Sequence, residues 1–318
     1  DKRTGKIYGP PTNKMLYVFI DDMNMPIVDE YGTQQPIATL LHLLGRGQMW
    51  DYVKDLSPRV YKDMRFLAAM GPPGGGRNPV DTRFIARFSV FNLTPPTVDV
   101  LDGIYSQILT SFFAVMNDQV KKCTAKLTSM TLRLYGTIQE KLPRTPTNFH
   151  YIFNLRDLGK IFQGLCQATV DKIDDDVKCV RLWRNEIDRV ITDRLTSDED
   201  IKVVRDMQIQ LLREQFPAQA DEVMKDPSMF GNFEFAAARI SEDAEDPRLY
   251  GDVGGYQEVR QTFDDILEVY NSDANLKPMT LVLFESALDH LTRIYRLINM
   301  PRGNALLVGV GGSGKQSL

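Results

Sequence analysis

The sequence ends in Gly309-Val-Gly-Gly-Ser-Gly-Lys-Gln-Ser-Leu318, in which Gly309, Gly314 and Lys315 have the GxxxxGK spacing of a phosphate-binding loop. In such a loop the backbone N–H groups and the N-terminus of the following helix bind phosphate oxygens, and the lysine reaches the terminal phosphates. The apolar residues 305–308 before it predict the buried strand from which the loop emerges. We therefore expect a nucleotide to be bound by Gly309, Gly311, Gly312, Ser313, Gly314, Lys315, Gln316 and Ser317.

The position after the lysine departs from the usual pattern. A phosphate loop normally has Ser or Thr there, whose hydroxyl ligates Mg²⁺, but this sequence has Gln316 followed by Ser317. Glutamine can offer an amide oxygen, which is a poorer Mg²⁺ ligand. We expect Ser317 to be the metal ligand of this loop, and the pattern favours nucleotide binding over turnover.

The best acidic strand for such a site is Val18-Phe-Ile-Asp-Asp22, near the other end of the chain. Asp21 would hold Mg²⁺ through water, and Asp22 would polarise the attacking water in place of the usual Glu. Because Asp is one methylene shorter, its carboxylate would lie roughly 1.5 Å further from that water, which would slow hydrolysis. The alternative is that the two acids only cap the following turn.

The order of these motifs predicts two consecutive ATPase modules. A phosphate loop normally precedes its acidic strand, whereas here it follows. The simplest explanation is the back part of one module, followed by the first strand and loop of the next. The chain alone would then hold acids without their phosphate loop and a phosphate loop without its acids. We therefore expect no ATP turnover from this chain in isolation.

Apolar patterns predict an α/β part followed by an all-helical part. Short apolar runs predict a parallel strand covered on both faces at 15–20, a second buried strand at 65–70 and a third short strand at 88–93. A helix is predicted at 36–44 and a surface hairpin or loop at 48–62. Helical spacing predicts a helix over 101–115, a second that ends at Leu142, and further helices over 153–170, 180–195, 197–213, 256–270 and 281–299. Ser197 is the predicted N-cap of the helix over 197–213. We expect an α/β domain at 1–98, a helical lid at 99–230, a linker and leading helix at 231–280, and a second α/β domain beginning at 281–318.

The composition excludes several classes of protein. A net charge of −4 over 318 residues gives no reason to expect nucleic acid as a partner. Three scattered cysteines and three histidines are more typical of reduced thiols in a cytosolic protein than of a metal site. The apolar runs are short, so we expect no membrane span, and no signal peptide is visible at the start.

The loop between Gly71 and Arg77 follows the second predicted strand, where a doubly wound ATPase places a polar side chain against the γ-phosphate. Gly71 offers no such side chain. Arg77, Arg83 and Arg87 come next, and an arginine here could reach into a neighbouring module as a trans finger. We favour Arg83 for this catalytic role, the alternative being a solvated or structural arginine.

Several long motifs together resemble the third AAA+ module of axonemal dynein heavy chains. They are Tyr8-Gly-Pro-Pro-Thr-Asn-Lys14, Phe19-Ile-Asp-Asp-Met-Asn-Met-Pro26, Tyr31-Gly-Thr-Gln-Gln-Pro36, Ala69-Met-Gly-Pro-Pro-Gly-Gly-Gly-Arg-Asn78, Tyr151-Ile-Phe-Asn-Leu-Arg-Asp157 and Asp193-Arg-Leu-Thr-Ser-Asp-Glu-Asp200. The run from Pro301 to Leu318 resembles the start of the fourth module. The resemblance implies an incomplete P-loop AAA+ large domain, a helical lid domain and the start of a second AAA+ large domain.

The resemblance also assigns roles to single residues. It implies that Asp21 and Asp22 are the Walker B acids of the third module, whose own Walker A loop would lie upstream of Asp1. Gly71 falls where more active modules have a sensor-1 Asn, and Arg156 matches the sensor-2 arginine of the lid. Arg83 would face the nucleotide of the second module. Gly309, Gly314, Lys315 and Ser317 match the Walker A loop of the fourth module.

The function that this resemblance implies is regulatory. The third and fourth modules of the family bind ATP or ADP with Mg²⁺ between neighbouring modules, while the first performs the main hydrolysis. The implied partners are the adjacent AAA+ modules, microtubules bound by regions outside this chain, and dynein intermediate and light chains, in the cytoplasm and cytoskeleton of a ciliary or flagellar axoneme. One alternative is a ring segment that binds nucleotide only structurally. Another is a tandem-AAA remodelling ATPase, against which the Asn-Met-Pro and Gly-Gly-Gly-Arg-Asn runs argue.

Overall fold

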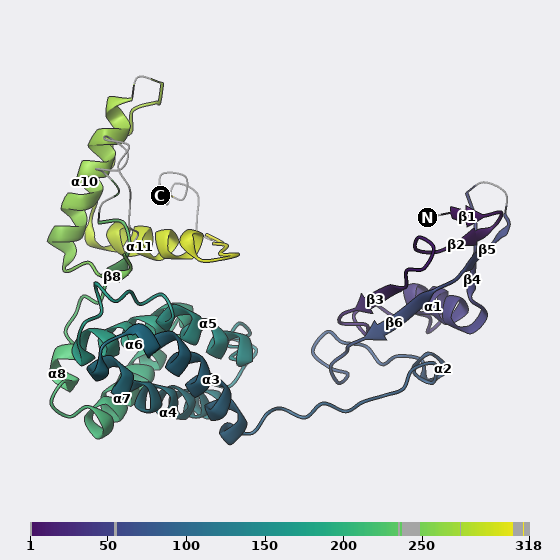
Figure 1. The fold of residues 1–318 in the computed structure, drawn as a ribbon, viewed down its shortest axis with the longest axis horizontal. Helices are drawn as coiled ribbons and strands as arrows, with labels where there is room; N and C mark the ends of the chain where they lie inside the picture. The colour runs from purple at the N-terminus through teal and green to yellow at the C-terminus, as the bar shows by residue number, and fades with distance from the viewer. Residues whose placement is uncertain are drawn as a thin grey trace. The chain divides into compact units, whose positions relative to one another are not determined.

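The computed structural model describes residues 2–53, 56–234, 236, 249–273, 275–307 and 314. The chain divides into two compact units, Asp1–Pro95 and Pro96–Leu318 (Figure 1). Each unit has a hydrophobic core of its own.

The first unit is built on two parallel strands, β3 (Leu16–Ile20) and β6 (Met64–Ala68), paired in register from Leu16↔Met64 to Ile20↔Ala68. Helix α1 (Gln35–Arg46) provides the crossover between them that parallel strands need. It begins with a proline in its first turn and ends where Gly47 adopts a φ of 67°. Together with α2 (Thr82–Ile85), α1 covers one face of the pair around buried Met23, Ile37 and Phe84.

A second, four-stranded sheet lies in the same unit, in the order β1 (Lys2–Thr4), β2 (Ile7–Tyr8), β5 (Pro58–Tyr61), β4 (Gln48–Trp50). Strands β4 and β5 are antiparallel neighbours in the chain. The hairpin predicted over residues 48–62 is therefore confirmed.

Two predictions about strands were wrong. Strand β3 is not covered on both faces, since Tyr17 and Phe19 are 66% and 64% exposed. Residues 88–93 are not a strand, and Val90, Phe91 and Leu93 are exposed. A strand exists only where a neighbour completes its hydrogen-bond ladder, and the described residues supply none to this run. For the same reason the described part of the predicted strand at 305–308 is irregular.

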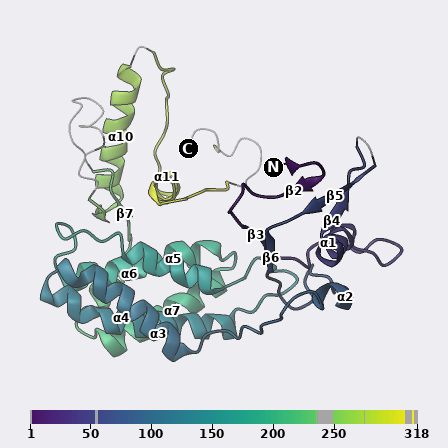
Figure 2. The ribbon, with the colours of Figure 1, turned by 45° about the vertical axis from the view of Figure 1, so that its right-hand side comes forward.

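The second unit begins with a helical bundle that both views show clearly (Figure 1, Figure 2). Its elements are α3 (Val98–Phe112), η1 (Phe113–Val115), α4 (Asp118–Lys141), α5 (Leu155–Leu165), α6 (Asp176–Val190), η2 (Thr192–Arg194), α7 (Asp198–Gln215) and α8 (Ala220–Val223). Trp183 is fully buried at its centre and donates a hydrogen bond from Nε1 to Thr131 Oγ1 at 2.8 Å. The predicted helices are confirmed, although those predicted to end at Val170 and Leu195 end at Leu165 and Val190.

Helix caps explain where two of these helices start. Ser197 Oγ accepts the N–H of Glu199 at 3.2 Å, as predicted for the N-cap of α7. Asn154 and Asp157 form a capping box at α5, each side chain accepting the other's backbone N–H. The cap therefore fixes the first turn of α5, which contains Arg156.

The rest of the second unit has a small core of its own and is joined to this bundle by side-chain contacts. It consists of β7 (Phe230–Gly231), β8 (Gly251–Asp252), α10 (Tyr256–Ser272) and α11 (Glu285–Asn299). Its small core contains Phe233, Val259 and Leu288. The segment expected to be a linker and leading helix thus contributes buried side chains as well as connections.

Among the described residues, the stretch Val98–Val115 is long and apolar enough to cross a membrane by length and composition, although only 11% of it is buried. Uninterrupted apolar runs in the sequence did not indicate this stretch. Polar residues such as Asp99 and Gln107 interrupt the runs, but the mean hydropathy of the stretch stays apolar. Leu101 and Leu109 are buried in the bundle core, which accounts for part of the apolar character.

Candidate functional site

The two acids identified in the sequence lie at the carboxyl end of β3. Asp21 directly follows Ile20, and the pocket beside it has a volume of about 460 Å³. Asp21, Asp22 and the first turns of α1, from Pro36, line this pocket. Ligands of parallel α/β sheets bind outside the carboxyl ends of the strands, so the pocket has the position expected of a binding site.

The backbone and a neighbouring cation orient Asp22. Its φ is 47°, a left-handed conformation uncommon for a residue other than glycine. Its N–H donates to Asp21 Oδ1 at 2.9 Å. Its own Oδ1 accepts a hydrogen bond from Arg77 Nη2 at 2.9 Å, in an ion pair whose side chains are 49% and 42% exposed.

Asparagines join the loop after β3 to the loop after β6. Asn24 is fully buried, and its Nδ2 donates to the carbonyl of Gly71 at 2.7 Å. The N–H of Asn78 donates to the carbonyl of Asn24 at 2.8 Å, and Asn78 Nδ2 donates to that of Pro26 at 2.9 Å. Sequence reasoning missed these roles, although Asn24 and Asn78 each stand within a recognised motif.

A glycine turn brings Arg77 back toward the acids. Gly74, Gly75 and Gly76 have φ values of 128°, 58° and 90°, which other residues rarely adopt. The turn closes with hydrogen bonds from Gly74 N–H to the Arg77 carbonyl at 2.9 Å and from Arg77 N–H to the Gly74 carbonyl at 3.1 Å. The Arg77 guanidinium then passes close to Gly71, where an added Cβ would lie 3.0 Å from Nη1.

Arg83, the predicted finger, pairs with a different acid in the structure. Its Nη2 donates to Asp81 Oδ2 at 2.9 Å, and Asp81 in turn caps α2. This hydrogen bond lowers the pKa of Asp81 and raises that of Arg83. The side chain of Arg83 is 80% exposed. A role in a neighbouring module therefore stays a prediction.

Family models and relatives agree on what this chain resembles. Models match the P-loop containing dynein motor region over residues 1–96, the AAA+ lid domain over 127–226 and the P-loop containing dynein motor region D4 over 279–318. Over its whole length the chain is 49% identical to dynein axonemal heavy chain 10 of Homo sapiens and 37% identical to dynein axonemal heavy chain 5 of Mus musculus. It is 47% identical to the dynein-1-alpha heavy chain of the flagellar inner arm I1 complex of Chlamydomonas reinhardtii.

The chain belongs to the dynein heavy-chain family. It spans about 7% of the length of each of these three relatives. The resemblance found in the sequence is confirmed, as is the fold: part of one AAA+ motor domain, an AAA+ lid and the beginning of a second motor region.

The remaining predicted site residues of this dynein segment belong to its second unit. Arg156 lies in the first turn of α5 with an exposed side chain, and its backbone N–H donates to Asn154 Oδ1 at 2.9 Å. In the phosphate loop only Gly314 is described, with a φ of 75°. The other predicted ligands lie outside the described residues, namely Gly309, Gly311, Gly312, Ser313, Lys315, Gln316 and Ser317.

The side chains of the first unit of this dynein segment suit Mg²⁺ only as an ion shared with a bound nucleotide. Across the described parts of the chain, no three His, Cys, Asp or Glu side chains gather as a metal cage. Mg²⁺ usually binds through one or two carboxylates together with water and nucleotide phosphates. Exposed Asp21, at the edge of the pocket, suits that arrangement, whereas Asp22 already binds Arg77.

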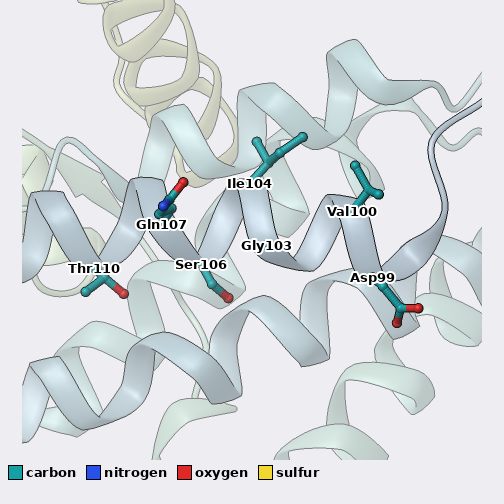
Figure 3. A pocket seen from close by; sticks show the side chains of 7 residues that line it. All are labelled: Asp99, Val100, Gly103, Ile104, Ser106, Gln107 and Thr110. Carbon is teal, nitrogen blue, oxygen red and sulfur yellow. The ribbon is translucent and has the colours of Figure 1, made fainter.

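A second hollow of this dynein segment lies along α3, with a volume of about 510 Å³ (Figure 3). All its lining residues belong to one face of α3, between Asp99 and Thr110. They include a carboxylate and no cationic side chain, so this surface lacks the groups that bind phosphate.

Proposed function

We propose that this segment contributes regulatory nucleotide-binding modules to an axonemal dynein motor. The whole heavy chain would hydrolyse ATP and move along microtubules in a cilium or flagellum, and these modules would bind ATP or ADP and adjust the ring. The observation that carries the proposal is the pair Asp21 and Asp22 at the carboxyl end of β3, in a chain that dynein motor models match.

The finer assignments follow from the same proposal. Asp21 would hold Mg²⁺ through water, Arg156 would contact nucleotide from the lid, and Lys315 and Ser317 would bind nucleotide and Mg²⁺ in the next module. Arg83 would act on the nucleotide of the preceding module. The partners would be adjacent AAA+ modules, microtubules through other regions, and dynein intermediate and light chains.

A binding module without hydrolysis is the second candidate. Gly71 provides no side chain toward a γ-phosphate, and the Asp22 carboxylate is engaged by Arg77. Both observations favour slow turnover at this site. The family assignment argues against the remodelling ATPase considered from sequence.

The proposal is tested in the full heavy chain with Asp21→Asn, Asp22→Asn and a Glu30→Gln control, since Glu30 is an exposed acid of the same unit. Because Asp21 would hold the metal, Asp21→Asn should lower Mg²⁺-dependent nucleotide retention by about tenfold or more. Asp22→Asn should keep the nucleotide but change microtubule gliding at limiting ATP. Glu30→Gln should change neither. Unchanged retention in Asp21→Asn and unchanged gliding in Asp22→Asn would refute the regulatory role.

A further inference from the structure

The Arg77 guanidinium that contacts Asp22 passes over Gly71, where a side chain would crowd it. Arg77 Nη2 lies 2.9 Å from Asp22 Oδ1. A Cβ on Gly71 would lie 3.0 Å from Arg77 Nη1 and 3.2 Å from its Cζ, closer than side chains normally pack. Gly71, which has no side chain to serve as a sensor, is therefore also the residue over which the Arg77 guanidinium passes.

The backbone of the loop from Gly71 to Asn78 directs the Arg77 side chain toward Asp22. The Gly74–Gly76 turn reverses the chain directly before Arg77. Buried Asn24 holds the start of the loop through the Gly71 carbonyl, and the Asn24 carbonyl holds its end through Asn78. These bonds fix both ends of the loop against the segment that carries Asp22, so the backbone itself holds Arg77 near that carboxylate.

We propose that Arg77 is a positioning residue that occupies the Oδ1 of Asp22 and so restrains ATP hydrolysis at the site formed with Asp21. This inference rests on the proposed nucleotide binding at that site. In hydrolysis Asp22 would accept a hydrogen bond from the attacking water. While Oδ1 accepts from the guanidinium, one of its acceptor sites is occupied and the nearby positive charge makes the carboxylate a weaker acceptor for water.

The size of the restraint follows from the exposure of the pair. Both side chains are nearly half exposed, and exposed ion pairs shift equilibria only modestly. We therefore expect removal of the pair to raise turnover that depends on Asp22 by about two- to fivefold. A cation serving the γ-phosphate would behave oppositely, since its loss would weaken nucleotide binding and slow turnover.

The test is a double-mutant cycle in the purified full heavy chain. Turnover that depends on Asp22 is the ATPase rate of a protein minus the rate of the same protein carrying Asp22→Asn. Arg77→Ala should raise this difference about two- to fivefold, while Arg77→Lys, which keeps the charge, should restore most of the restraint. Gly71→Ala should raise it by less, because its Cβ forces the guanidinium to shift by only a few tenths of an ångström. Arg46→Ala, which removes an exposed cation at the end of α1, is the control and should change nothing.

The outcomes separate this inference from the proposed function. Unchanged Asp22-dependent turnover in Arg77→Ala and Gly71→Ala, with bound nucleotide retained, would overturn the restraint alone. Weaker nucleotide binding in Arg77→Ala would overturn it in favour of a phosphate contact. Nucleotide retention that does not respond to Asp21→Asn would remove the binding site itself. Equal effects of Arg77→Lys and Arg77→Ala would also count against an ion pair as the cause.

Discussion

A single carboxylate, Asp157, joins two parts of the lid. It belongs to the capping box of α5, and it accepts hydrogen bonds from Arg194 Nη1 at 3.1 Å and Nη2 at 2.5 Å. Arg194 also donates to the Ile152 carbonyl at 2.9 Å. Burial alone would raise the pKa of Asp157, but hydrogen bonds from Arg194 and the Asn154 backbone outweigh it and lower the pKa. The charged form is therefore the one that the fold stabilises.

The lowered pKa of Asp157 determines how the stability of the fold changes with pH. A lowered folded-state pKa adds stability above the unfolded pKa of about 3.9, and that stability is lost as the pH falls through the folded value. Arg194→Gln should cost about 2–3 kcal/mol at pH 7, because it leaves a buried carboxylate without its charged donor. The cost should shrink below about pH 4, where the carboxyl of the variant is protonated.

Urea unfolding followed by the fluorescence of buried Trp183, in a Trp50→Phe background, measures this difference. Arg205→Gln is the control, since the Arg205 side chain is 46% exposed and its partner Asp226 lies 3.5 Å away. We expect the control to stay within about 0.5 kcal/mol of wild type. A cost for Arg194→Gln that is equal at pH 7 and pH 3 would contradict the assignment.

At the scale of elements, a buried ion pair between Arg296 and Glu186 connects α11 to the lid helix α6. Arg296 of α11 donates to both oxygens of Glu186, which is fully buried. Tyr250 and Asn185 donate to Glu186 Oε1 at 3.1 and 3.0 Å. Burial alone would lower the pKa of Arg296, but Glu186 and Tyr250 raise it, so the cation persists. Burial and Glu186 hold the pKa of Tyr250 well above its usual range.

Breaking this pair on one side should be costly. Arg296→Met leaves Glu186 charged and buried, and we expect a loss of about 3–5 kcal/mol in unfolding free energy. The double variant Arg296→Met with Glu186→Gln should recover part of it. Arg293→Met on the same helix is the matched control, because its ion pair with Asp193 is longer, at 3.5 Å, and the Arg293 side chain is one-third exposed. We expect about 1 kcal/mol or less for the control, and similar losses for both arginines would refute the buried pair's role.

Helices could be predicted from the sequence more reliably than strands. Helical spacing and caps such as Ser197 act within one segment, so the sequence contains what the helix needs. The run at 88–93 has the composition of a strand, but its hydrogen-bond partner has to come from elsewhere in space, and periodicity cannot show whether one is present. The same limit explains the exposed face of β3.

At the scale of the whole chain, the segment that joins the two units is open to proteases. Residues 89–97 have no helix or strand, and Phe91 and Leu93 are 83% and 90% exposed. Chymotrypsin should therefore cut the 318-residue chain after Phe91 early, as it should after the equally exposed Tyr31, leaving the helical bundle intact. Phe113, fully buried in that bundle, provides the internal control. Fragment masses over a time course measure the order, and early cleavage after Phe113 would contradict the division.

The candidate site could be predicted in part. Asp21 and Asp22 were found because an apolar strand followed by acids is a local pattern, and family membership was found because its motifs are long. The partner of Asp22 was missed, since Arg77 was weighed only as a finger toward another module. The direction of the Arg77 side chain depends on three glycines in left-handed conformations and on the absence of a side chain at Gly71. Neither the charge pattern nor the motif spacing of the sequence shows these features.

The turn formed by Gly74, Gly75 and Gly76 also makes the contact of Arg77 sensitive to heat. Glycines lose more conformational entropy on ordering than other residues, and this loss weighs more as the temperature rises. Segments with few buried apolar contacts open locally before a core does. We therefore expect warming to release the Asp22 carboxylate from its arginine while β3 and β6 are still paired.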